Sequence, residues 1–266
     1  MSDDAAARVG RCLPGRGEGP CAVISDIHSN LLALESVLAD IEAQGIDGVC
    51  CLGDIVGYGA RPVECWRAVK ERCPVIIIGN HEQALSAKGV SRFHPRARAA
   101  IEWTRARIFR EEDGEGIFNS LVSLPIGFTC GERLFVHGSP AGPTMDYLLP
   151  RDAFDSERMS REFEKVDRVA FNGHSHIPGV VERGGAFVPP DGLAGASYAF
   201  GPRPAIINVG SVGQPRDGNP KSCYVIVEDN RVRYRRVAYD ADKAAKEILA
   251  EPELDPFLGY RLLEGR

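Results

Sequence analysis

Histidine, aspartate and asparagine recur in short polar turns, each of which follows an apolar run of the chain. The turns are Ser25–His28, Gly53-Asp54, Gly79–His81, His137–Pro140 and Asn172–His176. Taken alone, each turn has an ordinary explanation, such as a helix cap or a strand end. The pair His174 and His176 is more informative, because alternate residues of an extended segment project to the same side and imidazole is a common metal ligand. Together the five turns indicate a metal site.

The residue types in these turns suit a centre of two divalent ions. Two ions roughly 3.5–4 Å apart can hold both the attacking and the leaving oxygen of a phosphoryl displacement. One carboxylate must bridge such a pair, and we expect Asp54 to be the bridge. The candidate ligands are Asp26, His28, Asp54, Asn80, His137, His174 and His176. Because no cysteine is among them, a structural zinc site is disfavoured; we expect Mn²⁺, with Fe²⁺/Fe³⁺, Zn²⁺ and Ni²⁺ as alternatives.

Such a centre removes the need for a nucleophilic side chain. A water at an open coordination position would be deprotonated near neutral pH by the metals, and the hydroxide would attack phosphorus. The Gly-x-Ser-x-Gly pattern of serine hydrolases does not occur in the chain.

The first three polar turns follow continuous apolar runs that alternate with helical patterns. The predicted strands are Cys21–Ile24, Gly48–Leu52 and Val75–Ile78. A helix is predicted from about residue 31, with Ser29 or Asn30 as its cap and Gly45 as its stop, and a second one over Pro62–Arg72. This alternation predicts a mostly parallel sheet that is covered on both faces. Ligands of such sheets gather beyond the carboxyl ends of the strands, where these turns lie.

The later elements are predicted in the same way. An arginine-rich helix is expected from Pro95 to about Glu112, and another helix near 151–165. Further strands are expected at 133–136, 168–171, 205–208, 223–227 and 231–239, the last two joined by a tight turn at Asp229-Asn230. The alternation of apolar and polar residues along the last strand breaks at Arg235-Arg236. This predicts either a β-bulge or a point beyond which other segments no longer cover the strand. Residues 241–266 are predicted to be a terminal helix and a tail.

Composition restricts the class of protein. The chain has 266 residues, 44% of them hydrophobic and 26% charged, as in an ordinary globular protein. Its net charge of −5 argues against general nucleic-acid binding. The eight cysteines form no Cys-x-x-Cys pair, so a zinc ribbon is not expected. Residues 1–20 lack the apolar segment of a secretory signal and are predicted to be a flexible tail, and no run could span a bilayer; we therefore expect a cytoplasmic protein.

The ordered motifs resemble those of the calcineurin-like metallophosphoesterase superfamily. They are Asp26-x-His28, Gly53-Asp54, Gly79-Asn80-His81-Glu82, Val136-His137-Gly138 and Gly173-His174-x-His176. The resemblance covers about residues 21–240, with a helical lid at about 82–120. The segments 53–59, 100–104 and 208–218 are similar to a bacterial subgroup described as phosphodiesterases or diadenosine-tetraphosphatase-like proteins.

The resemblance implies an α/β fold, a four-layer αββα sandwich of two mixed sheets. One metal would be held by Asp26, His28, Asp54 and His176, and the other by Asp54, Asn80, His137 and His174. It also implies that His81 is not a ligand, but the residue that protonates the leaving oxygen or stabilises charge on the transferring phosphoryl group.

The substrate is less constrained by the sequence. Arg216 and Ser211, in a glycine-rich loop, are candidates for phosphate contact, and Tyr58 either stacks on a base or fills a loop. His94 either lines the substrate mouth or, as is more usual, caps a helix. The arginines of the helix at 95–112 either grip a polyphosphate or form a solvated face paired with Glu102, Glu111 and Glu112.

We expect a small, phosphorylated, nucleotide-like substrate, with a dinucleoside polyphosphate first among the choices. A cyclic-nucleotide or nucleic-acid phosphodiesterase, a protein phosphatase and a catalytically silent binding scaffold are the alternatives. We expect no membrane partner and no stable nucleic-acid partner, and the sequence leaves an oligomer open.

Overall fold

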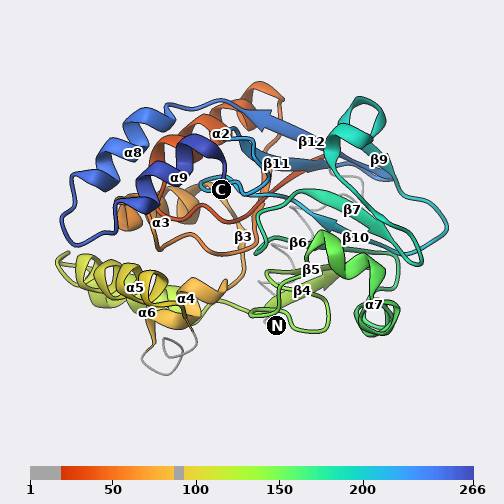
Figure 1. Cartoon of the computed structure of the whole chain (residues 1–266), viewed down its shortest axis with the longest axis horizontal. Coiled ribbons are helices and arrows are strands. Elements are labelled where there is room, and N and C mark those ends of the chain that lie inside the picture. Colours follow the sequence, from red (N-terminus) through yellow and green to blue (C-terminus); the bar gives the residue numbers. More distant parts are fainter. Residues whose placement is uncertain (1–18, 87–92) are drawn as a thin grey trace.

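Two mixed sheets of six strands lie against each other between helices in the computed structural model, which describes residues 19–86 and 93–266 (Figure 1). The first sheet has the order β3 (Val75–Ile76), β2 (Gly48–Cys51), β1 (Cys21–Ile24), β11 (Ser222–Val227), β12 (Arg231–Val237) and β9 (Ser197–Ala199). The second has the order β4 (Gly127–Cys130), β5 (Arg133–Val136), β6 (Val169–Asn172), β10 (Ala205–Asn208), β7 (Gly179–Glu182) and β8 (Phe187–Val188). The expected αββα sandwich of two mixed sheets is confirmed.

The helices of the described segments cover the outer faces of the sheets. They are α2 (Leu31–Ala43), α3 (Pro62–Arg72), α4 (Asn80–Leu85), α5 (Pro95–Ile108), α6 (Gly114–Val122), α7 (Ser156–Phe163), α8 (Ala241–Leu249) and α9 (Phe257–Glu264). Short 3-10 turns occupy Pro150–Phe154, Pro190–Gly192 and Ala194–Ala196. Within the described ranges, no helix combines the length and the apolar character that crossing a bilayer requires.

Strand β1 shows why the apolar runs are continuous. Ala22 and Ile24 belong to the cluster that β1 forms with helices α2 and α3, whereas Cys21 and Val23 belong to the cluster between the two sheets. All four side chains are buried. A strand covered on both faces needs apolar residues at every position, so its sequence does not alternate.

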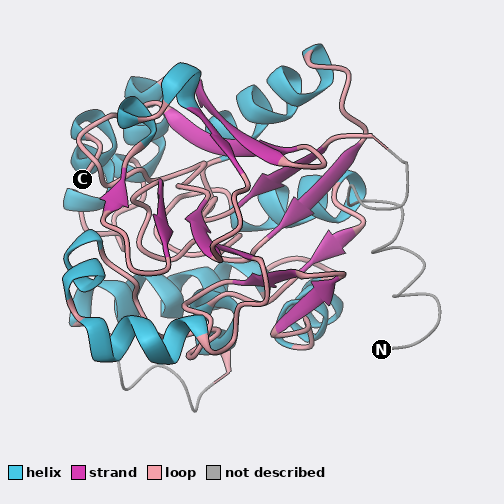
Figure 2. Ribbon diagram, turned by 90° about the vertical axis from the view of Figure 1, so that its right-hand side faces the viewer, coloured by secondary structure: helices cyan, strands magenta, loops and turns pink. Residues whose placement is uncertain are grey.

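The second sheet is covered on its outer face by α7, and Figure 2 shows the strands of both sheets in a view turned by 90°. Met159 and Phe163 of α7 pack with Ala170 of β6 and Ile206 of β10. The two sheets thus share one inner core, and each has an outer cluster with its own helices.

The helices next to the first two strands form where the sequence predicts them. The amide of Ala33 donates to Oδ1 of Asn30 at 3.2 Å, so Asn30 is the cap of α2. Gly45 follows α2 with φ +68°, a conformation that favours glycine. Helix α3 has the predicted bounds, and its proline occupies the first turn.

Strand β3 is shorter than predicted. It pairs with β2 only over Val75 and Ile76. The amide of Ile77 still donates to the carbonyl of Cys51, but that of Ile78 donates to the carbonyl of Pro125. The chain therefore leaves the sheet two residues early, on its way to α4.

Two predicted helices end earlier or are divided. The helix predicted to reach Glu112 ends at Ile108, and α6 begins at Gly114, where a Cβ atom would lie 2.3 Å from the carbonyl oxygen of Ile108. The helix predicted at 151–165 is a 3-10 turn followed by α7. Asp155 separates them, and its carboxylate accepts the amide of Arg158 at 3.0 Å as the N-terminal cap of α7.

Strand β12 contains no bulge. Its register with β11 is unbroken from Val227↔Val232 to Ser222↔Val237, so that alternative is wrong. Instead, the strand leaves cover at this point: Arg235 pairs with Asp40 of α2, and Arg236 pairs with Asp217. Ion pairs with neighbouring segments, rather than a change of register, explain the loss of alternation.

The C-terminal segment is not a single helix with a tail. Helices α8 and α9 pack together and place Ile248, Leu258 and Leu262 in a cluster with Trp103 of α5. Tyr58, in the loop before α3, packs against the same cluster. Helix α9 thus lies beside α8 (Figure 1) and packs in a cluster with α5 and the loop of Tyr58. Most of the predicted N-terminal tail, up to residue 18, and residues 87–92 of the predicted lid lie outside the described residues.

Candidate metal centre

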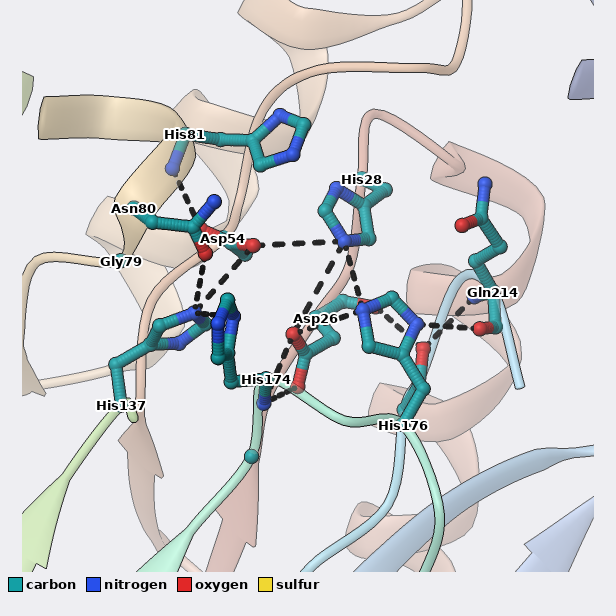
Figure 3. A network of polar contacts seen from close by, with 12 residues as sticks. Asp26, His28, Asp54, Gly79, Asn80, His81, His137, His174, His176 and Gln214 are labelled. Carbon is teal, nitrogen blue, oxygen red and sulfur yellow. Dashed lines mark hydrogen bonds and ion pairs between the residues drawn. The ribbon is translucent and has the colours of Figure 1, made fainter. Parts of the chain in front are cut away.

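The polar turns of both sheets meet at one place, because β1, β2 and β3 run parallel, as do β5, β6 and β10. In each group the carboxyl ends lie together, and the side chains that follow them converge (Figure 3). Asp26 and His28 follow β1, Asp54 follows β2, Asn80 begins α4 after β3, His137 follows β5, and His174 and His176 follow β6. All seven predicted ligands are brought together.

These side chains divide into two groups that share one residue. In the first group, ligand atoms of Asp26, His28, Asp54 and His176 all lie within 4.8 Å of one another. In the second, the same holds for Asp54, His137 and His174. Oδ1 of Asn80 lies 2.9 Å from Nε2 of His137 and so adds an amide oxygen to the second group.

The two carboxylate oxygens of Asp54 have different surroundings. Oδ1 accepts the amide N–H of His81 at 2.8 Å. Oδ2 lies 3.6 Å from Nε2 of His28 and 3.4 Å from Nε2 of His137, one residue from each group. One oxygen is thus held by the backbone, and the other faces both groups of ligand atoms.

Four imidazoles are oriented by backbone carbonyl groups. The contacts join Nδ1 of His28 to Val56 O (3.3 Å), Nδ1 of His137 to Leu52 O (2.9 Å), Nε2 of His174 to Met145 O (3.2 Å) and Nδ1 of His176 to Gln214 O (2.5 Å). Since a carbonyl only accepts, each of these nitrogens carries its proton, and the other nitrogen of the ring offers a lone pair to the centre.

The remaining nitrogens then face one another at short range. Nε2 of His28 lies 3.2 Å from Nε2 of His176, and Nε2 of His137 lies 3.2 Å from Nδ1 of His174. Two lone pairs at this distance repel each other unless a proton or a metal ion lies between them. The donor set therefore fits divalent metal ions of the kind that imidazole and carboxylate bind.

The pKa values of the candidate histidine ligands show the same need for positive charge at the site. Burial lowers the pKa of His28 well below its usual value and that of His174 to about 3. Burial would also lower the pKa of His137, but the carboxylate of Asp54 raises it to about 9. In a metal-free protein, a proton on His137 thus supplies positive charge beside Asp54.

The backbone is strained where it carries the ligands. Five of the seven candidates have φ between +50° and +64°: Asp26, His28, Asp54, His174 and His176. This left-handed region costs a residue other than glycine about 1–3 kcal/mol. Surrounding bonds impose it; for example, the amides of Ile27 and His28 both donate to the carbonyl of Asp54, at 2.8 and 2.9 Å.

Glu82 supports the centre without being among its ligand groups, and its role was not predicted. Its buried carboxylate accepts amide N–H groups from Asp54 (2.8 Å), Ile55 (2.8 Å), Val56 (3.0 Å) and Gly79 (2.9 Å). Burial, and then the charge of Asp54, raise its pKa to about 7. Its place in the motif Gly79–Glu82 was the signal in the sequence, but amide contacts to a distant loop cannot be read from that motif.

His81 lies beside the two ligand groups but belongs to neither. Its ring centroid is 4.7 Å from that of His28 and 4.5 Å from that of Tyr58, and the ring is buried. Within the described parts of the chain, its Nδ1 has no hydrogen-bond partner. The ring of His81 is thus held beside the two ligand groups without joining either.

The predicted substrate contacts have different outcomes. Tyr58 packs against His28 and His81, so it lies at the centre. Ser211 is fully buried; its hydroxyl donates to the carbonyl of Asp26 at 2.8 Å and accepts the amide of Gln214, so it supports the ligand loop. The amide of Arg216 donates to the carbonyl of His176 at 3.2 Å, which places the backbone of Arg216 beside one of the candidate ligands.

The arginine-rich segment forms surface ion pairs, as in the second alternative, but of the partners expected there these pairs include only Glu111. Arg107 pairs with Glu111 and Arg110 with Glu253, while Arg96 pairs with Asp255. His94 is the N-terminal cap of α5, and its Nδ1 accepts the amide of Arg96 at 3.4 Å.

Tyr147, which lies at the centre, and Arg261, on the helix whose end docks on the loop of Arg216, were not predicted. Tyr147 stacks on His174 with ring centroids 3.8 Å apart, and 44% of its surface is exposed. Arg261 is on α9. Neither residue is in a recognisable motif, so its position is determined only by the folding of the chain.

Comparisons with known proteins place the chain in a family. Residues 21–231 match the family model described as the calcineurin-like phosphoesterase superfamily domain. An uncharacterised protein of Methanocaldococcus jannaschii is 37% identical over 253 residues, which cover 92% of this chain and 98% of that protein. The crystal structure of a metallophosphoesterase from Sphaerobacter thermophilus has a TM-score of 0.79 and 33% identity, over 93% of this chain and 99% of that one. A hypothetical protein from Pyrococcus horikoshii shares the fold, with a TM-score of 0.72, 20% identity and coverage of 92% and 98%.

Proposed function

This chain belongs to the calcineurin-like phosphoesterase superfamily and is a metal-dependent phosphoester hydrolase, and from that premise we propose that it uses two metal ions to cleave a nucleotide-like substrate. The best choice of substrate is a dinucleoside polyphosphate. The observation that carries the proposal of two ions is the position of Asp54 Oδ2, 3.6 Å from Nε2 of His28 and 3.4 Å from Nε2 of His137.

The first ion is assigned to Asp26, His28, Asp54 and His176, and the second to Asp54, Asn80, His137 and His174. Nitrogen and oxygen donors of this kind favour Mn²⁺, with iron, zinc and nickel as alternatives. When bound, two such ions lower the pKa of water and neutralise charge on phosphoryl oxygens.

A side chain next to the two ions is proposed to take part in the reaction as well. His81 is proposed to hydrogen-bond the phosphoryl group or to supply a proton to the leaving oxygen, because its Nδ1 is free of partners in the described structure and its ring lies beside His28. The amide of His81 also holds Asp54, so backbone and side chain of one residue act on the same site.

The surroundings of the centre leave room for a nucleotide. A cleft of about 630 Å³ opens beside His174, and Met145, Tyr147 and Arg151 are among the residues that line it. This volume is in the range of small-molecule sites. The exposed ring of Tyr147 offers a surface on which a base could stack.

A turnover screen of the purified protein with added Mn²⁺ tests the proposal. It compares diadenosine tetraphosphate, a cyclic nucleotide, bis-p-nitrophenyl phosphate and a phosphopeptide, with Asp54→Asn as the inactive control. The highest kcat/KM is expected for the dinucleotide. Hydrolysis of the cyclic nucleotide or phosphopeptide alone would reassign the substrate, and no hydrolysis by a metal-loaded protein would favour a binding scaffold.

A further inference from the structure

Arg216 lies next to the candidate metal centre, and Arg261, from a distant part of the chain, is on the helix whose end docks on the Arg216 loop. Arg216 is in the loop after β10, and its amide donates to the carbonyl of His176 at 3.2 Å. Its Nη2 donates to Oε1 of Gln214 at 2.9 Å, and the backbone carbonyl of Gln214 holds Nδ1 of His176. The Nε atom of Arg216 is buried and, in the parts of the chain that the structure describes, has no hydrogen-bond partner.

Arg261 is held near this loop by the docking of α9. The amide of Gly218 donates to the carbonyl of Gly265 at 3.0 Å, which ties the end of α9 to the loop of Arg216. Gly265 has φ +66°, and a Cβ atom there would lie 2.6 Å from the backbone of Asn219. The approach of helix and loop is thus close and specific.

The side chain of Arg261 is also fixed. Its guanidinium lies 5.4 Å from the ring centroid of Phe257, and its Nε donates to the carbonyl of Arg266. The guanidinium of Arg96 lies over the same ring at 4.2 Å. Leu258 and Leu262 anchor the helix in its apolar cluster, so little conformational freedom remains to be lost when a ligand binds.

Neither Arg216 nor Arg261 has an acidic side chain in ion-pair contact within residues 19–86 and 93–266. Other arginines of the same region do: Arg96 pairs with Asp255 and Arg236 with Asp217. Burial, and then the charge of Arg216, lower the pKa of Arg261 to about 10. The positive charges of the two arginines thus oppose each other, and no carboxylate of the described residues forms an ion pair with either.

We propose that Arg216 and Arg261 form a second anion subsite, which binds a phosphate of the substrate adjoining the phosphoryl group that is cleaved. This rests on the proposed function and narrows it to substrates that carry at least one further phosphate. Planar guanidinium forks bind phosphate through paired hydrogen bonds, and an anion between them relieves the repulsion of the two cations. Simple diesters with a single phosphate would leave the subsite empty.

The kinetic test compares two substrates in the metal-loaded enzyme. Arg261→Gln is expected to raise KM for diadenosine tetraphosphate by about tenfold to a hundredfold, with little change in kcat/KM for bis-p-nitrophenyl phosphate. Arg261→Lys keeps the charge without the fork and should fall between. Arg266→Gln is the matched control, because that exposed side chain pairs only with Glu264 among the described residues. Equal effects of Arg261→Gln and Arg266→Gln, or equal losses on both substrates, would reject the subsite.

A binding measurement separates this proposal from the proposed function. Calorimetry with tripolyphosphate, on the metal-loaded protein, should show weaker binding to Arg261→Gln and Arg216→Gln than to Arg266→Gln, even if no tested substrate is turned over. Melting temperatures of all variants establish that they fold. If tripolyphosphate binds equally to the folded variants, the subsite is wrong whatever the enzyme hydrolyses; if it binds as predicted without turnover, only the proposed reaction is wrong.

Discussion

The carboxylate of Glu82 accepts the backbone N–H of Asp54 at 2.8 Å, so a buried acid outside both ligand groups holds the residue that the two groups share. The same carboxylate accepts the amides of Ile55, Val56 and Gly79. A single side chain thus fixes the loop after β2 against the start of α4. Outer contacts of this kind orient metal ligands and are frequently as important as the ligands.

Glu82→Gln is therefore expected to weaken metal binding, by about tenfold to a hundredfold, because an amide cannot accept all four N–H groups with both of its ends. Titration of the apoprotein with Mn²⁺, followed by calorimetry, measures the change. Glu42→Gln, at an exposed site, is the control. Unchanged affinity in Glu82→Gln would show that the loop keeps its shape without this carboxylate.

Asp54→Asn is expected to lose most bound metal and most turnover, because Oδ2 of Asp54 is the oxygen that faces both groups. Metal content by mass spectrometry and the rate on bis-p-nitrophenyl phosphate are measured together. The exposed Asp47→Asn serves as the control. Normal metal content with full turnover would exclude a bridging role.

His81→Ala is expected to keep its metal and to lose about 10²–10⁴ in rate on esters with poor leaving groups. The reason is that the ring of His81 lies beside the ligand groups without belonging to them. His174→Ala, which removes a ligand, should instead lose metal. Equal metal loss in the two variants would contradict this division of roles.

Gly57→Ala tests the placement of the His81 ring while leaving the histidine itself in the chain. Gly57 has φ +91°, and a Cβ atom there would lie 2.1 Å from Nδ1 of His81. The ring must move, so the rate should fall as in His81→Ala while the metal is retained. Gly184→Ala, also at positive φ but with open space around the added carbon, controls for backbone strain. Wild-type rates in a folded Gly57→Ala would show that the position of the ring is unimportant.

Asp40→Asn should change the dependence of stability on pH. Hydrogen bonds from Arg235 lower the pKa of Asp40 below its usual 3.8. The pKa of Asp40 is lower in the folded protein than in the unfolded chain. The ionised carboxylate therefore stabilises the fold fully at pH values above the unfolded pKa, and this stabilisation is lost as the pH falls through the folded pKa. At neutral pH the variant should be about 1–2 kcal/mol less stable, with a smaller difference near pH 2. Chemical denaturation in the presence of a metal chelator measures the free energy of unfolding at each pH, and Glu35→Gln, at an exposed site, is the control. A stability difference between Asp40→Asn and the wild type that does not change with pH would contradict the prediction.

Local sequence determined the parts of the fold that depend on neighbours in the chain. The run Cys21–Ile24, the cap at Asn30 and the proline at the start of α3 each predict an element that the structure contains. Because parallel strands place their carboxyl ends at one edge, the same reasoning grouped the seven candidate ligands, which the structure brings together. Both follow from periodicity and turn chemistry, which are local properties.

What depends on contacts between distant segments was decided only by the tertiary structure. Strand β3 ends early because the amide of Ile78 donates its hydrogen bond to the carbonyl of Pro125. Glu82 acts through amides of a loop almost thirty residues earlier in the chain. Arg261 is brought to the loop of Arg216 only because the end of α9 docks at Gly218. A sequence motif specifies the chemistry of a side chain, but the packing of remote segments determines which groups that side chain meets.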